Sequence, residues 1–138
     1  MDGTSDKRRR TLALHHRAIR FSTAINLSCP NRFSNLPSER VWDQLVRAGD
    51  STSSNLIEAD DALSDADFLH KMGIALREAK ESRTALMKIR LACLDHAHKV
   101  AEQQLEDEAG QLAAIFSAII RNMKLRLEQQ RMRQGRRR

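Results

Sequence analysis

Apolar residues recur through most of this chain at alternating intervals of four and three, the spacing that lines one face of an α-helix. The pattern is unbroken from Phe68 through Met72, Ala75, Ala79, Ser82, Leu86 and Ile89 to Cys93. It predicts a helix that Ser64 caps, with Asp65 and Asp67 in its first turn. Further apolar residues lie off this stripe, so we expect the helix to bury more than one face: Leu69, Leu76, Met87, Leu91 and Leu94.

Similar stripes predict three more helices. The first covers about residues 11–27 and ends before Cys29-Pro30, because the residue before proline disfavours helix. The second covers about residues 39–62, with Ser38 as its cap and Leu63 widening its apolar face. The fourth covers about residues 102–131, after a predicted loop over residues 95–101. Short connections favour antiparallel neighbours, so we expect an all-α, up-down-up-down four-helix bundle.

Composition agrees with this fold class. Strong helix formers dominate after Arg40, both prolines lie between residues 30 and 37, and aromatic residues make up only 4%. The 138 residues suit one domain, without room for a catalytic module beside a binding module. The charged N-terminal segment is unlike a secretory signal, no apolar run is long enough for a membrane span, and the two cysteines are far apart. We therefore expect a cytoplasmic protein without a membrane partner.

The net charge of +6 is concentrated at the ends. Nine of the 24 basic residues stand at Lys7, Arg8, Arg9, Arg10, Arg131, Arg133, Arg136, Arg137 and Arg138, whereas residues 11–130 hold 15 basic and 16 acidic residues. The chain is therefore divided into a basic tail at 1–10, a bundle at 11–131 and a basic tail at 132–138. Such runs are commonly solvated surface, but two of them on a near-neutral body favour a polyanionic partner.

The middle of the chain carries a more specific set of residues. These are Gln44-Leu45-Val46-Arg47-Ala48, Ser51, Asn55-Leu56-Ile57-Glu58-Ala59, Ser64, Asp67-Phe68, Lys71, Ile74-Ala75-Leu76 and Glu81. The set resembles the bacterial four-helix-bundle proteins encoded in intervening sequences of large-subunit ribosomal RNA genes. The accessory variability proteins of diversity-generating retroelements share that fold. The sequence departs from the family pattern at Ala59, where glycine is frequent, and at Thr84-Ala85-Leu86, where many members are rich in aromatic residues.

The resemblance implies a four-helix protomer that assembles as a ring-like homopentamer and has no known enzymatic activity. For the retroelement branch, it implies binding to nucleic acid and to a reverse transcriptase. Five motif residues are expected to be structural: Ser51, Asn55, Glu58, Phe68 and Glu81. Thr52 and Asn55 lie on the apolar stripe, where polar groups can fix helix register, with Glu58 and Glu81 as expected partners in one network.

Catalytic and metal-binding alternatives receive less support. Glu58, Asp60, Asp61, Asp65 and Asp67 could hold Mg²⁺, but they gather around a helix end without a catalytic lysine or histidine beside them. The cluster Cys93, His96 and His98 lacks the second ligand pair that structural zinc requires, and His15-His16 is distant in sequence. We therefore predict no catalytic residue, no metal and no cofactor.

Basic residues are the remaining functional candidates: Lys7, Arg8, Arg9, Arg10, Arg77, Lys80, Lys88, Arg121, Lys124, Arg131, Arg133, Arg136, Arg137 and Arg138. No aromatic residues stand among the arginines to stack on bases, so contacts would go mainly to phosphates of RNA or DNA. The first hypothesis is a non-enzymatic, oligomeric nucleic-acid-binding accessory protein that partners a reverse transcriptase or another RNA-handling enzyme. The second is a protein–protein scaffold whose basic tails are incidental.

Overall fold

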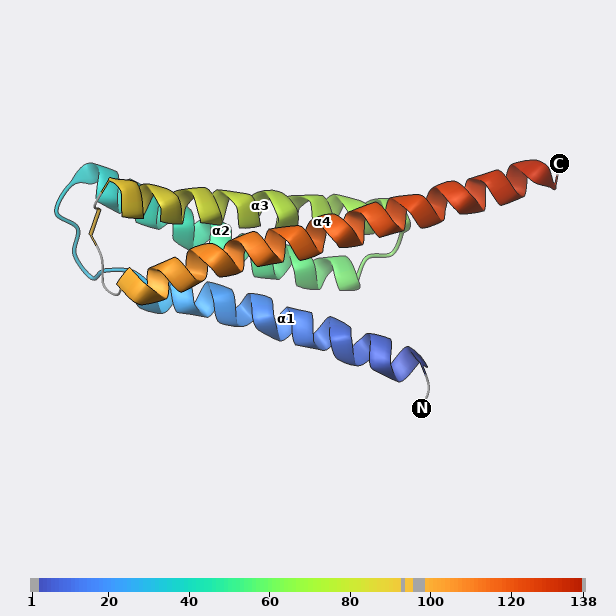
Figure 1. Cartoon of the computed structure of the whole chain (residues 1–138), viewed down its shortest axis with the longest axis horizontal. Coiled ribbons are helices and arrows are strands. Elements are labelled where there is room, and N and C mark those ends of the chain that lie inside the picture. Colours follow the sequence, from blue (N-terminus) through green and yellow to red (C-terminus); the bar gives the residue numbers. More distant parts are fainter. Residues whose placement is uncertain (1–2, 93, 96–98, 138) are drawn as a thin grey trace.

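The computed structural model describes residues 3–92, 94–95 and 99–137, and these form four α-helices without a β-strand. They are α1 (Gly3–Ser28), α2 (Leu36–Asp60), α3 (Asp65–Leu91) and α4 (Lys99–Arg136). Consecutive helices run in opposite directions, and α4 packs back against α1, whereas the backbones of the diagonal pairs stay farther apart (Figure 1). The prediction of an all-α fold with four helices is confirmed.

The core follows the stripes predicted from the sequence. Along α3, the residues Met72, Ala75, Ala79, Ser82, Leu86 and Ile89 are each at most 2% exposed. The small side chains let α2 and α3 pack closely, and these two helices share the most extensive interface of the bundle. Three large aromatic side chains, Phe21 of α1, Trp42 of α2 and Phe116 of α4, fill the remaining space and are also buried.

The cap of α2 differs from the prediction. Asn35, not Ser38, caps the helix, and its side-chain oxygen accepts a hydrogen bond from the Ser38 N–H at 3.0 Å. The buried Ser38 hydroxyl instead accepts the backbone N–H of Asp95 at 2.9 Å, and the Trp42 indole donates to the Asp95 carbonyl at 2.9 Å. Both Asn35 and Ser38 suit a cap, and the long-range partner of Ser38 gives no local signal. For α3, the predicted cap Ser64 is confirmed by its bond from the Asp67 N–H at 3.1 Å.

Both terminal helices extend beyond the predicted limits of residues 11–27 and 102–131. The basic segment around Lys7 is helical, because α1 begins at Gly3, and α4 continues through Arg133 to Arg136. Arginine, lysine and glutamine are good helix formers, so a charged segment can prolong a helix without burying anything. α4 also starts at Lys99, inside the predicted loop, whose residues 96–98 lie outside the described part of the chain.

The α2–α3 connection corrects a further prediction. Leu63 was expected to widen the apolar face of the second helix, but α2 ends at Asp60 and the Leu63 side chain is 100% exposed. Leu91, at the end of α3, is 69% exposed, whereas Leu69, Leu76 and Met87 are half-buried and Leu94 is buried. The second apolar face of α3 is therefore covered only in part within one chain.

α1 and α4 separate toward the end of the bundle that carries both termini, and α4 projects past the other helices there (Figure 1). Arg17 of α1 binds Glu108 of α4 where the two helices are still close, with its Nε 3.0 Å from a carboxylate oxygen. This hydrogen bond raises the pKa of Arg17 further, so the guanidinium stays charged. None of the described helices is long and apolar enough to cross a membrane.

Candidate nucleic-acid interface

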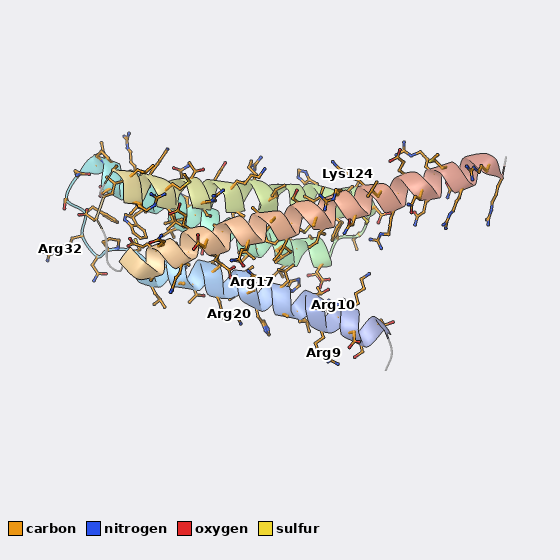
Figure 2. All side chains as sticks on the ribbon, in the orientation of Figure 1. Arg9, Arg10, Arg17, Arg20, Arg32 and Lys124 are labelled. Atoms are coloured by element: carbon orange, nitrogen blue, oxygen red, sulfur yellow. The ribbon has the colours of Figure 1, made fainter. Side chains whose placement is uncertain are left out.

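The two basic segments lie at one end of the molecule, on two separate helices (Figure 1). Successive residues of a helix are rotated by about 100°, so Lys7, Arg8, Arg9 and Arg10 point in four directions around α1. The cations of the α4 extension, from Arg131 to Arg137, are likewise exposed, as the side-chain view indicates (Figure 2). The end of the bundle thus presents two basic arms, defined here as residues 3–10 of α1 and 126–137 of α4.

Few of these charges are neutralised within the protein. Arg8 binds Asp60 of α2 at 2.6 Å, and Arg9 lies 3.5 Å from Asp6 in its own helix. Among the described residues, the other cations of the arms make no ion pair: Lys7, Arg10, Arg126, Arg131, Arg133, Arg136 and Arg137. Positive charge at this end is therefore available to a partner.

The helix dipole explains one arm but not the other. Cations near a helix C-terminus are stabilising, so Arg133 and Arg136 at the end of α4 have a structural reason to be there. The N-terminus of a helix is its positive end, where Asp or Glu would be favourable and cations are not. Asp6 occupies the first turn of α1, and Lys7 to Arg10 follow in the second turn, where the dipole has little effect. The dipole therefore gives these four cations no structural role, unlike the cations at the end of α4.

The other basic candidates lie on the sides of the bundle. Arg77, Lys80 and Lys88 of α3 are exposed, and Arg77 has Glu78 within 3.7 Å. Arg121 and Lys124 of α4 are also exposed, just before the projecting arm (Figure 2). The remaining candidate, Arg138, lies outside the described residues.

The polar motif residues have other hydrogen-bond partners than the predicted network gave them. Thr52 is fully buried and donates to the Ala48 carbonyl at 2.7 Å, while the half-buried Asn55 amide donates to the backbone and side-chain oxygens of Ser51 at 2.9 Å. Glu58 does not join Asn55 but binds Lys71 at 2.8 Å, which links α2 to α3. The expectation of a single network was wrong because Thr and Asn satisfy themselves within their own helix.

The other two motif residues lie on α3. The Phe68 side chain is half-buried and packs against the core. Glu81 lies beside Glu78, whose pKa is raised by burial and then by the Glu81 carboxyl, with Arg77 opposing the rise. Of the motif residues, Glu58 thus links α2 to α3 through Lys71, and Phe68 adds to the core.

The alternative sites gain no support from the geometry. Two of the five carboxylates proposed for Mg²⁺ are already paired, Asp60 with Arg8 and Glu58 with Lys71. Within residues 3–92, 94–95 and 99–137, no three Asp, Glu, His or Cys side chains converge as metal ligands would. His15 is buried whereas its neighbour His16 is exposed, and the alternative cluster of Cys93, His96 and His98 lies outside the described residues.

Two features of the structure have no counterpart in the sequence analysis. Asp95 joins the α1–α2 loop to the segment before α4, because its carboxylate accepts both the N–H and the hydroxyl of Ser34 at 2.7 Å. A groove of about 480 Å³ lies at the basic end, where α1 and α4 separate. Both arise from contacts between residues far apart in the chain, so local spacing could not indicate them.

The fold and the basic end define the class of this protein: a small, all-α four-helix-bundle protein with cationic helix ends. The model of the 23S rRNA-intervening sequence protein family matches residues 10–118, and the chain belongs to that family. The resemblance inferred from the motif between Gln44 and Glu81 is thereby confirmed. Arg10 lies at the margin of the match, and most cations of the two arms fall outside it.

A solved structure with a similar fold is described as a protein of unknown function from the S23 ribosomal protein family of Bacteroides thetaiotaomicron. It aligns with a TM-score of 0.61 and 24% identity, over 78% of this chain and 97% of that one. The similarity shows the shared helical fold. No match was found among curated proteins.

Proposed function

We propose that this protein is a nucleic-acid-binding accessory protein that holds RNA or DNA by its phosphates through the two basic arms. The observation that carries the proposal is the placement of the cations Lys7 to Arg10 and Arg131 to Arg137 on two helices at one end of the molecule. The helix dipole gives Lys7 to Arg10 no structural role, which supports a role for these exposed charges in binding an anion. The family, which is named for a 23S rRNA intervening sequence, supports an RNA-related role.

The chemistry of the arms favours backbone contacts over base recognition. Arginine binds phosphate with two parallel hydrogen bonds, and each phosphate neutralised releases condensed counterions. Neither arm contains an aromatic residue that could stack on an unpaired base. The proposed complex is therefore strongly salt-dependent and has little sequence preference.

Self-association extends the proposal. A ring-like homo-oligomer, such as the pentamer that the family resemblance implies, would repeat the basic end several times and increase its field. Exposed apolar side chains, Leu12 and Ile19 of α1 and Leu91 of α3, give such contacts a physical basis. In this setting we propose that a reverse transcriptase or another RNA-handling enzyme is the protein partner. Light scattering tests the first step, because a monomeric mass at micromolar concentration would contradict it.

The experiment compares two variants that lose the same charge. In the arm variant, Arg133, Arg136 and Arg137 become Gln; in the control variant, Arg20, Arg32 and Arg40 become Gln. All six arginines are exposed and without an ion pair in the described structure, and Arg20 and Arg32 lie away from the basic end (Figure 2). Fluorescence anisotropy with labelled single- and double-stranded RNA and DNA measures the affinity of each.

We expect the arm variant to bind about tenfold or more weakly, because each lost phosphate contact removes part of the counterion-release free energy. The control variant should stay close to the wild type. Equal losses in both variants would mean that only net charge matters and would refute an interface at the arms. No binding of the wild type at physiological salt, together with a stable protein partner, would favour the scaffold hypothesis instead.

A further inference from the structure

The groove between α1 and α4 is a gap in the bundle rather than a surface dimple. It opens where these two helices separate, and its volume of about 480 Å³ falls within the range of ligand sites, about 300–1,000 Å³. Its wall is mainly apolar, with Leu14 on α1, Leu56 on α2, Phe68 and Met72 on α3, and Met123 on α4. One face of a fifth helix could therefore pack in the groove, as the four helices pack against one another in the bundle.

The charges around the groove are arranged unequally. Lys7 and Arg126 line its mouth from α1 and α4. Arg10 lies seven residues before Arg17, which binds α4, so helical periodicity places Arg10 on the same α4-facing side. The acidic lining residues, Asp60 and Asp65, lie on the opposite side at the α2–α3 connection, and Asp60 is already paired with Arg8. The edge of the groove formed by α1 and α4 is thus basic, whereas its edge at the α2–α3 connection is acidic.

The basic end of a second copy of this chain is a poor occupant. The exposed apolar residues of α4 at that end stand among cations: Leu125 lies between Lys124 and Arg126, and Met132 lies between Arg131 and Arg133. Inserting either into a basic mouth would bring like charges together. The acidic first turns of α4, with Glu102 and Glu106, are used within the bundle, where Glu106 binds Arg90 at 3.0 Å.

We propose that the groove binds an acidic amphipathic helix of another protein, which inserts an apolar edge between α1 and α4. Leucine-like side chains at intervals of three and four fill the gap, and flanking carboxylates pair with Lys7, Arg10 and Arg126. Met72 and Met123 give the wall adaptable side chains, which suit a partner of variable shape. This site shares Lys7, Arg10 and Arg126 with the basic arms, but peptide binding in the groove does not require phosphate binding by the cations from Arg131 to Arg137.

The probe is a fluorescein-labelled synthetic helix of leucine and glutamate, compared with a leucine–lysine helix of the same length and leucine positions. We expect the glutamate peptide to bind full-length protein about tenfold or more tightly than the lysine peptide, because only the former complements the mouth. Reversing the charge of the mouth with Lys7→Glu and Arg126→Glu should weaken the affinity for the glutamate peptide by a similar factor. A control pair, Arg20→Glu and Arg77→Glu, changes the charge equally away from the groove and should leave the affinity within about twofold.

A filling variant, Ala62→Trp, tests the apolar part without changing charge. Ala62 lines the groove just after the end of α2, so a large side chain there should occupy the space and weaken the affinity for the peptide. The circular dichroism spectrum should still be that of a helical protein. Equal affinity for the two peptides, or equal effects of the mouth and control variants, would overturn the proposal. An unchanged affinity of the correctly folded Ala62→Trp variant would overturn it as well.

Discussion

Gly49 lies where α1 leaves no room for a side chain on α2. A Cβ atom added at this position would stand 2.7 Å from Cδ1 of Ile25, a residue that is fully buried. Overpacking of this kind costs about 1–3 kcal/mol. Replacing glycine with alanine inside a helix gains about 0.8–1.0 kcal/mol, so Gly49→Ala should range from nearly neutral to about 2 kcal/mol less stable.

Gly73 of α3 provides the matched control. No atom lies within 4 Å of a Cβ built there, so Gly73→Ala receives the helix-forming gain of about 0.8–1.0 kcal/mol without a steric cost. The two substitutions are chemically identical. The difference between their effects on the free energy of unfolding therefore measures the steric cost of a methyl group at position 49, where Ile25 of α1 lies close. Urea unfolding followed by circular dichroism, at one fixed protein concentration, measures both.

Ile25→Val removes the Cδ1 atom that the new methyl group would meet. In the wild type this substitution should cost about 0.5–1.5 kcal/mol, as shortening a buried isoleucine normally does. In the Gly49→Ala background it should cost clearly less, because it also relieves the clash. Two results together would refute the close packing of α1 on α2. Gly49→Ala would stabilise the protein as much as Gly73→Ala does, and the effects of Gly49→Ala and Ile25→Val would add within about 0.5 kcal/mol.

Two further predictions concern a titrating carboxyl group and a helix cap. Burial raises the pKa of Glu78, so its contribution to stability is greatest when it is protonated and is lost as the pH rises through that pKa. Glu78→Gln should therefore have little effect near pH 4 and stabilise by about 0.2–0.5 kcal/mol at pH 7, measured by urea unfolding; a larger gain at acidic pH would contradict this. Asn35→Ala should cost about 1 kcal/mol in thermal or urea unfolding, because the Ser38 N–H loses its acceptor, whereas no loss would mean that another group caps α2.

The core could be predicted from the sequence because the spacing of apolar residues within each segment shows which side chains share a helix face. Met72, Ala79 and Ile89 repeat at helical spacing, and each is buried where the stripe places it. The motif around Glu58 likewise indicates the family from the sequence alone. Periodicity and a contiguous motif need no knowledge of distant contacts, so both could be recognised from one chain.

The remaining features depend on how separate helices meet. Ser38 and Asn35 are both suitable caps, and the choice between them depends on the Asp95 N–H, which donates to the Ser38 hydroxyl and leaves Asn35 to cap the helix. The helical state of Lys7 to Arg10 was missed because a charged segment without apolar residues has no stripe to detect. The groove arises from the divergence of α1 and α4, which no residue pattern encodes on its own.

The central claim is that the cations of the two helical arms bind nucleic-acid phosphates. Its most direct measurement is the slope of log affinity against log salt concentration for a duplex, with the wild type, the Arg133/Arg136/Arg137→Gln variant and the Arg20/Arg32/Arg40→Gln control. Each phosphate contact contributes about 0.9 to that slope, so the arm variant should have a slope shallower by up to about 3 while the control keeps that of the wild type. An arm variant with the wild-type slope would contradict the claim.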